Sequence, residues 1–247
     1  MYGFAIGDLT VQNADWDIVA QHAAVKAQQA MTARTQLAIS ALEGASLPSG
    51  NVIDVSGTYS STWAASTTTS KTIRKSLTAA AEKILDNTLA AVDVSDLVVV
   101  INSNLAKALA ECDEIVDYIK GSPEALAQIR GELPGRNVIY GLPNKLFGFE
   151  LVVEDTRKVT SKRGSTKNVS QILPNDRAYM IARVGGLEGL YGGPNFSSLV
   201  CFALRDNEFR VETRRDEDNK RTVGRIIDTI CYKVVCPAAT VRFTNCQ

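Results

Sequence analysis

The sequence predicts an α+β fold, because its long helical patterns come early in the chain and most of its strand patterns come late. Helix-forming patterns cover residues 15–42 and 72–91, and strands and helices do not alternate as they do in a repeatedly wound parallel sheet. The chain has 247 residues, of which 45% are hydrophobic and 22% charged, as in an ordinary globular protein of one large or two small domains. The late strands are expected at residues 199–205, 209–214, 226–235 and 239–243.

The first helix is predicted over residues 15–42, a stretch without Gly or Pro that is rich in Ala and Gln. Asp15 is expected to cap this helix, and Asp17 to complement the helix dipole in its first turn. The apolar face of the helix is thin and consists largely of alanine. Such a face buries little surface, so we expect close packing against another surface, with a second subunit as one candidate.

Residues 44–70 are rich in Ser, Thr, Ala and Gly, and Asp54 is their only charged residue. A turn at 48–51 precedes two expected extended arms at 52–55 and 58–63, and the Ser/Thr tract at 66–72 is also typical of a flexible linker. An uncharged extended segment on a free monomer would expose unpaired strand edges. We therefore expect this segment to be buried against a neighbouring molecule, with Tyr59 and Trp63 among the contact residues.

The second helix, at residues 72–91, has apolar residues at helical spacing and is expected to form part of a core. Its seam consists of Ile73, Leu77, Ala80, Ile84, Leu85 and Leu89. A buried strand follows at 97–101, and Ser103 is expected to cap a helix that runs to residue 119. A further short helix should begin at Pro123. Strands are also expected at 137–140, 149–154 and 178–184, with a polar loop at 159–175.

Residues 205–225 form a charged block in which 13 of 21 residues are charged, seven of them positive and six negative. A block that nearly cancels its own charge is better suited to ion pairs with neighbouring subunits than to binding a polyanion. Individual exposed pairs contribute about 0 to 1 kcal/mol, so many copies would have to act together. The interface residues expected here are Arg205, Arg210, Glu212, Arg214, Arg215, Asp216 and Glu217.

The residue types that support catalysis are scarce. The only histidine, His22, lies within an alanine-rich helix and is expected to be structural. The glycines at 185–193 follow an expected strand but lack the spacing of a dinucleotide site, and the acidic residues at 111–117 are typical of an ordinary helix face. We therefore expect no enzyme activity, no catalytic residue and no cofactor.

The charge balance and the cysteines exclude further classes of site. Lys plus Arg equals Asp plus Glu at 27 each, so no net field attracts nucleic acid, and the basic residues at 157–167 suit a solvated loop. The five cysteines lack the spacing of a zinc site, and no metal site is expected. No signal peptide and no membrane helix is expected either.

The order of these patterns resembles the major capsid proteins of tailed bacteriophages, the family with the Hong Kong 97-type fold. The resemblance spans nearly the whole chain and depends on order and pattern, without an invariant motif. It is carried by the helix at 16–42, the uncharged stretch that ends near Trp63, the helix at 72–91, the run 96–102 that leads into 105–119, and the later segments 142–145, 149–153, 178–181 and 226–243.

The resemblance implies a tile with an N-terminal arm, an extended loop, a peripheral domain with a long spine helix and a sheet, and an axial domain. It would place the arm and long helix at 1–43, the extended loop at 44–71, the spine helix at 72–96, the axial domain at 97–182 and the peripheral C-terminal sheet at 183–247. Residues 44–70 contain no Lys or Arg that could donate the covalent cross-link of some family members. A non-covalent shell is therefore expected.

The function that the resemblance implies is structural. Copies of the chain would assemble through hexamers and pentamers into an icosahedral phage head around double-stranded DNA, held without sequence specificity, in the cytoplasm of a bacterial host. Portal, scaffold or cement proteins would be further partners. Two alternatives remain open: an encapsulin-like nanocompartment shell, and an α/β small-molecule enzyme or binding domain.

Overall fold

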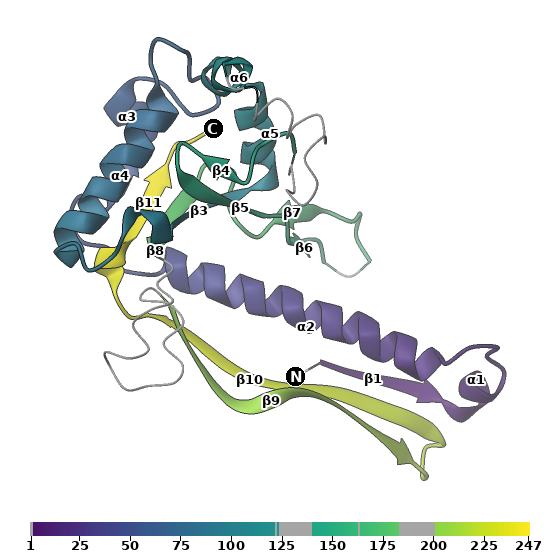
Figure 1. The fold of residues 1–247 in the computed structure, drawn as a ribbon. Helices are drawn as coiled ribbons and strands as arrows, with labels where there is room; N and C mark the ends of the chain where they lie inside the picture. The colour runs from purple at the N-terminus through teal and green to yellow at the C-terminus, as the bar shows by residue number, and fades with distance from the viewer. Residues whose placement is uncertain (1, 122, 124–139, 163, 183–200) are drawn as a thin grey trace. The chain divides into compact units, whose positions relative to one another are not determined.

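The computed structural model describes residues 2–121, 123, 140–162, 164–182 and 201–247, with only the backbone described at 2 and 201–209. These residues form two compact units, each with its own sheet. Unit 1 comprises Met1–Glu43 and Ala203–Lys233, and unit 2 comprises Gly44–Phe202 and Val234–Gln247 (Figure 1). The short helix expected from Pro123, the glycine cluster at 185–193 and nearly all of the strand expected at 137–140 lie outside the described residues.

Unit 1 is a long helix that lies alongside a three-stranded sheet of order β1-β10-β9 (Figure 1). The N-terminal strand β1, absent from the sequence prediction, pairs antiparallel with β10 from Tyr2 opposite Ile226 to Gly7 opposite Arg221. From Cys201 onward, one continuous strand, β9, takes the place of the two strands that were expected at 199–205 and 209–214. The elements of unit 1 are β1 (Tyr2–Gly7), α1 (Asp8–Gln12), α2 (Ile18–Glu43), β9 (Cys201–Asp216) and β10 (Arg221–Val234).

Helix α2 confirms the first predicted helix, although it begins three residues later than expected. Asp17 caps it in place of Asp15, because the Asp17 carboxylate accepts a hydrogen bond from the backbone N–H of Ala20 at 3.0 Å. The thin apolar face is also confirmed, since only Ala30, Ile39 and Leu42 are buried along its 26 residues.

The contact between helix and sheet in unit 1 depends on a glycine. Gly224 lies opposite Phe4 in the register of β1 and β10, and the Phe4 ring stacks on the ring of His22 from α2, with centroids 6.0 Å apart. A Cβ atom at Gly224 would lie 2.2 Å from the Phe4 ring. The missing side chain at Gly224 therefore leaves the space that the Phe4 ring occupies between β10 and His22 of α2.

Gly224→Ala is expected to displace the Phe4 ring and to lower the free energy of unfolding of unit 1 by about 1 to 3 kcal/mol, the usual effect of overpacking. Urea denaturation followed by near-ultraviolet circular dichroism measures this change. Gly3→Ala is the matched control on the neighbouring strand, because a Cβ there meets its nearest atom at 3.5 Å. Equal stability of the two variants would contradict the proposed packing.

Unit 2 is built on a six-stranded mixed sheet of order β2-β11-β8-β3-β5-β4. The central strand β3 is buried along nearly its whole length, which confirms the predicted buried strand. β3 runs parallel to β5, and β11 runs parallel to β2, whereas the other neighbours are antiparallel. The strands are β2 (Val52–Asp54), β3 (Leu97–Asn102), β4 (Lys145–Leu146), β5 (Phe149–Glu154), β8 (Ala178–Ala182) and β11 (Thr240–Thr244).

Helices and a small ribbon complete unit 2. Helix α4 confirms the second predicted helix, whereas the helix expected at 103–119 is divided at Cys112, whose backbone is extended. Asn102 caps α5 in place of Ser103, since its side chain accepts from the N–H of Leu105 at 2.7 Å. The helices are α3 (Val55–Tyr59), α4 (Thr72–Thr88), α5 (Ser103–Glu111) and α6 (Asp113–Lys120), with η1 (Val94–Asp96), η3 (Pro237–Ala239) and the ribbon of β6 (Arg157–Val159) and β7 (Val169–Gln171).

The expectation that residues 44–70 lie outside the subunit's own fold is wrong. Asn51 is 1% exposed, and its side-chain N–H group donates to the carbonyl oxygens of Thr240 at 2.9 Å and Ala238 at 3.2 Å. Strand β2 pairs with β11, and the expected extended arm at 58–63 begins inside helix α3. Asp54 starts that helix by accepting from the N–H of Gly57 at 3.0 Å. Asn51, Ile53, Val55, Trp63 and Ser66 are buried, so the segment packs onto unit 2 at these residues, while many of its other residues are exposed.

The two units also divide the chain differently from the expected domains. Residues 44–71, 72–96 and 97–182 all belong to unit 2, whereas 183–247 is shared between both units. Strand β11, near the C-terminus, pairs with β8 and β2, which explains why its segment joins unit 2. In the part of the chain that the structure describes, no helix is both long and apolar enough to cross a membrane.

Candidate assembly surfaces

The charged block forms ion pairs within its own subunit. Glu212 accepts from Arg210 at 3.0 Å and from Arg225 at 2.7 Å, and Asp216 accepts from Arg221 at 2.9 Å. Hydrogen bonds from Asn219, and then from Arg221, lower the pKa of Asp216. Most of the charged side chains that the structure describes in this block therefore have a partner of opposite charge on the β9–β10 hairpin itself.

An ion pair joins the tip of this hairpin to the N-terminal segment. Arg215 lies 3.0 Å from the carboxylate of Asp8 and 3.2 Å from that of Glu217. Arg214 is exposed and makes no ion pair with any residue that the structure describes. The side chain of Arg205 lies outside the described residues. Pairing of these residues with neighbouring subunits stays a prediction, and both Arg214 and Glu217 are exposed.

Trp63, expected at a subunit interface, is instead buried within its own unit. Its exposed fraction is 1%, its indole N–H donates to the hydroxyl of Ser76 at 2.8 Å, and its ring lies 4.9 Å from that of Phe243. Tyr59 is half-buried, and burial raises its pKa. Trp63 is therefore removed from the candidate interface, whereas the role of Tyr59 stays a prediction.

A buried carboxylate that the sequence analysis treated as part of an ordinary helix face joins two helices. Glu114 of α6 is 6% exposed, and its oxygens accept from the backbone N–H groups of Ile73 and Arg74, each at 3.1 Å, and from the hydroxyl of Ser66. It therefore caps the N-terminus of α4, whose own N-cap residue, Lys71, makes no side-chain cap. The missing local cap was the only sequence signal for such a partner.

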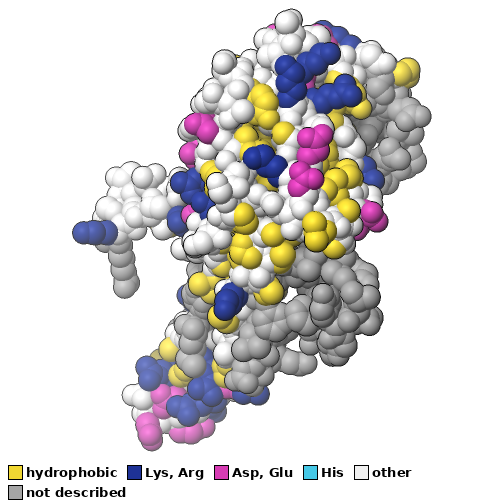
Figure 2. All heavy atoms as spheres, turned by 90° about the vertical axis from the view of Figure 1, so that its left-hand side faces the viewer, with side chains coloured by type: hydrophobic (Ala, Val, Ile, Leu, Met, Phe, Trp, Pro, Cys, Tyr) yellow, Lys and Arg dark blue, Asp and Glu magenta, His cyan; other side chains and the backbone are white. Residues whose placement is uncertain are grey.

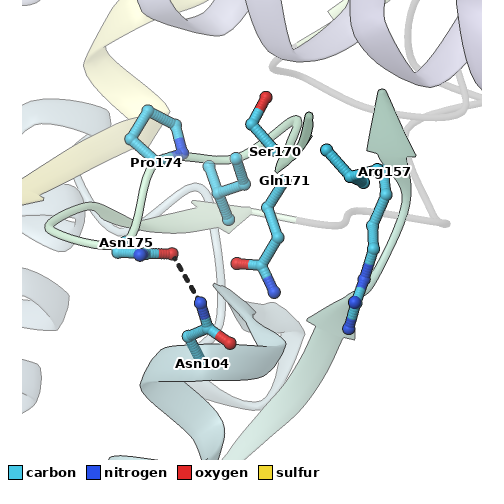
Figure 3. A pocket seen from close by; sticks show the side chains of 8 residues that line it. Asn104, Arg157, Ser170, Gln171, Pro174 and Asn175 are labelled. Carbon is cyan, nitrogen blue, oxygen red and sulfur yellow. Dashed lines mark hydrogen bonds between the residues drawn. The ribbon is translucent and has the colours of Figure 1, made fainter. Parts of the chain in front are cut away.

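A polar hollow of about 380 Å³ lies between α5 and the β6–β7 ribbon (Figure 3). In Figure 3 the side chains of Arg157 and Gln171 extend toward the side on which Asn104 lies, and Asn104 donates to Asn175 at 3.2 Å. The hollow is lined by Asn104, Arg157, Val169, Ser170, Gln171, Leu173, Pro174 and Asn175. Its lining consists mainly of amides, a hydroxyl and one guanidinium, a set that lacks a nucleophile paired with a base.

Asp155 lies beside this hollow and remains ionised. It accepts from the hydroxyls of Ser103 at 2.6 Å and Tyr140 at 2.7 Å and from Arg157 at 3.2 Å, and these donors hold its pKa at about 2. The same carboxylate raises the pKa of Tyr140. Neither group is suited to exchange protons near neutral pH. Among the described residues, no cluster of His, Cys, Asp or Glu could hold a metal ion.

The Asp155 network is expected to make unit 2 sensitive to acid. The pKa of Asp155 is about 2 in the folded state, against about 3.9 for an unperturbed aspartate, so its stabilisation is complete above about pH 4 and is lost as the pH falls toward 2. Urea denaturation between pH 2 and pH 6 measures this, and Asp155→Asn should flatten the slope. Asp218→Asn, on the exposed hairpin tip, is the control. If the unfolding free energy of Asp155→Asn depended on pH as steeply as that of the parent chain, Asp155 would not be the source of the acid sensitivity.

Comparisons with known proteins give matches only at the level of structure. No family model matches the sequence, and no curated protein matches it. The crystal structure of a phage-related protein from Bordetella bronchiseptica RB50 superposes with a TM-score of 0.66 at 12% identity, over 99% of this chain and 75% of the other. The capsid structure of cyanophage P-SCSP1u gives a TM-score of 0.57 at 13% identity, over 98% and 70%.

The chain has the Hong Kong 97-type capsid fold. A third structure of this type, the SrpI encapsulin of Synechococcus elongatus, superposes with a TM-score of 0.53 at 11% identity, over 99% of this chain and 72% of the other. The capsid fold thus includes both units, and the α+β class predicted from the sequence is confirmed. At these identities the likeness shows the fold alone.

Proposed function

We propose that this chain is the structural subunit of a self-assembling icosahedral shell, and specifically of a phage head that encloses double-stranded DNA. Support comes from the capsid fold over 98–99% of the chain and from the unsuitability of the polar hollow for catalysis. Hexamers and pentamers would be the assembly units, and portal, scaffold or cement proteins would join them. The balance of 27 basic and 27 acidic residues suits a shell that confines its DNA without binding it tightly.

Within this proposal, unit 1 is the peripheral domain and unit 2 the axial domain. The support for the first assignment is α2, whose 26 residues lie along a three-stranded sheet as a spine helix would (Figure 1). This proposal replaces the expectation that the spine lies at 72–96, because α4 belongs to the other unit. The compact six-stranded sheet with its helices then forms the axial domain.

The observation that carries the proposal is the small core of unit 1. Among the unit 1 residues whose side chains the structure describes, the buried hydrophobic ones are Ile6, Ala30, Ile39, Leu42 and Ile226. Trp16, Val25, Met31 and Leu37 are each about half exposed or more, from 49% for Met31 to 57% for Trp16. A unit of this size with so little buried apolar surface is marginal by itself. In an assembled shell, neighbouring copies would cover these side chains.

A bacterial nanocompartment shell is the second candidate. The observation in its favour is the superposition on the SrpI encapsulin, which covers as much of this chain as the phage structures do. The two candidates share the shell and differ in its contents, which are cargo protein in one case and DNA in the other. The third alternative, an enzyme, has no such observation in its favour, because the polar hollow beside Asp155 is unsuited to catalysis.

Negative-stain electron microscopy of the chain expressed in bacteria tests the proposal. Closed shells or capsomer rings are the expected result, and a small monodisperse species at high protein concentration would contradict it. For shells that form in the presence of the remaining head proteins, nuclease treatment followed by DNA extraction separates the candidates. Nuclease-protected DNA supports the phage head, whereas DNA-free shells that retain a protein cargo support the nanocompartment.

A further inference from the structure

Unit 2 contains a stretch of one-sided charge, although the chain as a whole has 27 basic and 27 acidic residues. Residues 156–175 include five basic residues and no Asp or Glu. The five are Arg157, Lys158, Lys162, Arg163 and Lys167. Most of this stretch forms the β6–β7 ribbon and the loop that joins its two strands. The ribbon is therefore a local positive surface on a chain without net charge.

The acidic residues that flank this stretch in the sequence have partners of their own. Asp155 accepts from Arg157 at 3.2 Å, so Arg157 is neutralised at the base of the ribbon. Glu154 accepts from a backbone N–H at 2.8 Å, and Asp176 lies 4.0 Å from Arg177. The ribbon also carries lysines that make no ion pair with any residue that the structure describes, namely Lys158, Lys162 and Lys167.

The loop between β6 and β7 has a defined shape. The N–H of Thr160 donates to the carbonyl of Asn168 at 2.9 Å, which extends the pairing of the two strands. The N–H of Ser165 donates to the carbonyl of Lys162 at 3.2 Å and closes a β-turn. Gly164 supplies the positive φ of 87° that the third position of such a turn requires. The loop therefore presents its side chains on a preformed turn.

The side chains of the loop are of the kinds that contact phosphate oxygens. At positions 160, 162 and 164–168 every residue is exposed, and the set consists of Lys, Ser, Thr, Asn and Gly. Ammonium groups, hydroxyls, amides and backbone N–H groups are the usual donors to the phosphates of nucleic acids. In Figure 2 the ribbon is the narrow projection at the left, and the charged side chains coloured at its outer end are basic.

We propose that the ribbon tip, residues 158–162 and 164–168, contacts the phosphate backbone of the enclosed DNA, so that this side of unit 2 faces the inside of the shell. The inference rests on the proposed function and names the surface through which the shell would meet its contents. One ribbon tip neutralises only a few phosphates, so a single contact is weak, but every copy repeats it. DNA is the polyanion that every copy of a phage head would meet.

Lys162→Gln with Lys167→Gln tests the contact in the unassembled chain. Both lysines are exposed, so the urea midpoint should stay unchanged. Fluorescence anisotropy of a labelled DNA duplex measures binding as the salt concentration rises from about 50 to about 200 mM. Each phosphate contact adds about 0.9 to the slope of log affinity against log salt, so the slope should fall by about two. Over this range the parent chain should therefore lose about tenfold more affinity than the variant.

Lys71→Gln with Lys75→Gln is the matched control. It removes the same charge at exposed positions at the start of α4, on the opposite side of unit 2 from the ribbon (Figure 1). The control should keep the salt slope of the parent chain. An equal loss of slope in both variants would attribute the binding to net charge and would overturn the assignment to the ribbon.

Two further measurements test the nature of the ligand. A second duplex of unrelated base sequence should bind with the same affinity, because phosphate contacts do not read the bases. Polyglutamate at a matched concentration of charge should displace the duplex much less well than unlabelled DNA does. Equal displacement would show that the ribbon tip binds acidic protein segments as readily as DNA, and the assignment to DNA would be wrong.

Trypsin reports which way the ribbon tip faces in assembled particles, because it cleaves after lysine. The exposed loop should be cut after Lys162 and Lys167 in the unassembled chain and protected in closed shells. Rapid cleavage of closed shells at these positions would place the ribbon tip outside and would overturn the inference.

The outcomes separate this inference from the proposed function. If the parent chain forms shells and the ribbon variant binds DNA with the affinity and salt slope of the parent, the ribbon contact is wrong and the shell function stands. If the parent chain binds DNA through the ribbon but never assembles, the proposed function fails and the phosphate contact stands.

Discussion

Replacing Glu114 by alanine is expected to lower the free energy of unfolding of unit 2 by about 3 to 5 kcal/mol, the usual effect of removing one partner from a buried charged network. The carboxylate is 6% exposed and accepts from the N–H groups of Ile73 and Arg74, which would lose their partners at the start of α4. Urea denaturation measures the change, and hydrogen exchange at the first turn of α4 should rise with it.

The control for Glu114 lies one turn further along α6. Asp117 accepts from the hydroxyl of Thr68 and is about half exposed, so Asp117→Asn should change stability by less than about 1 kcal/mol. Glu114→Gln keeps the size of the side chain but loses its charge and one acceptor, and it should be intermediate. A Glu114→Ala variant as stable as Asp117→Asn would show that the inter-helix cap is unimportant.

Trp63→Ala is expected to destabilise unit 2 by about 3 to 5 kcal/mol even in the isolated subunit, because the side chain is fully buried and its loss leaves a cavity. Trp63→Phe should cost about 1 to 2 kcal/mol, since it keeps the ring against Phe243 and loses the hydrogen bond to Ser76. Thermal unfolding of dilute, unassembled protein measures both changes.

Fluorescence provides the control, because the chain has two tryptophans and the other one, Trp16, is 57% exposed. Trp16→Phe should leave the stability of the unassembled subunit nearly unchanged and retain a blue-shifted emission from Trp63. If that remaining emission were solvent-like before assembly and shifted only on assembly, the original interface prediction for Trp63 would be restored.

Local patterns predicted most of the regular elements because their signals are short-range. The seam of α4 from Ile73 to Ile84, the continuous apolar run of β3 and the Gly- and Pro-free α2 each contain their own periodicity or length signal. The predicted ends of some of these elements were wrong, and those errors also have local causes. Asn102 competes with Ser103 as a cap, and Leu89, expected in the core seam, is exposed just beyond α4 with a φ of 52°, in a position where glycine is usual.

The main error was the prediction that residues 44–70 are buried against a neighbouring molecule. It arose because the partners of these residues are distant in the sequence. Their lack of charge indicated burial, which the structure shows for some of them, but the partners are Thr240, Phe243 and Cys246, which lie 180 or more residues away along the chain. No periodicity identifies such pairs, so burial within the subunit and burial against a neighbour look alike in sequence. Glu114 was missed for the same reason, because its partners precede it by about 40 residues on another helix.

The candidate assembly surfaces were predictable only in part. The charged hairpin is evident from composition, but the pairing of Glu212 with Arg225 depends on how β9 and β10 align.

Hydrogen exchange of the subunit before and after assembly tests the central claim that unit 1 is completed by neighbouring copies. In dilute, unassembled protein, the amides of α2 should exchange much faster than those of β3 and β8 in unit 2. In assembled particles, α2 should become protected to a similar degree as those strands. Protection of α2 that is already equal to that of β3 in the unassembled subunit, and unchanged on assembly, would contradict the account.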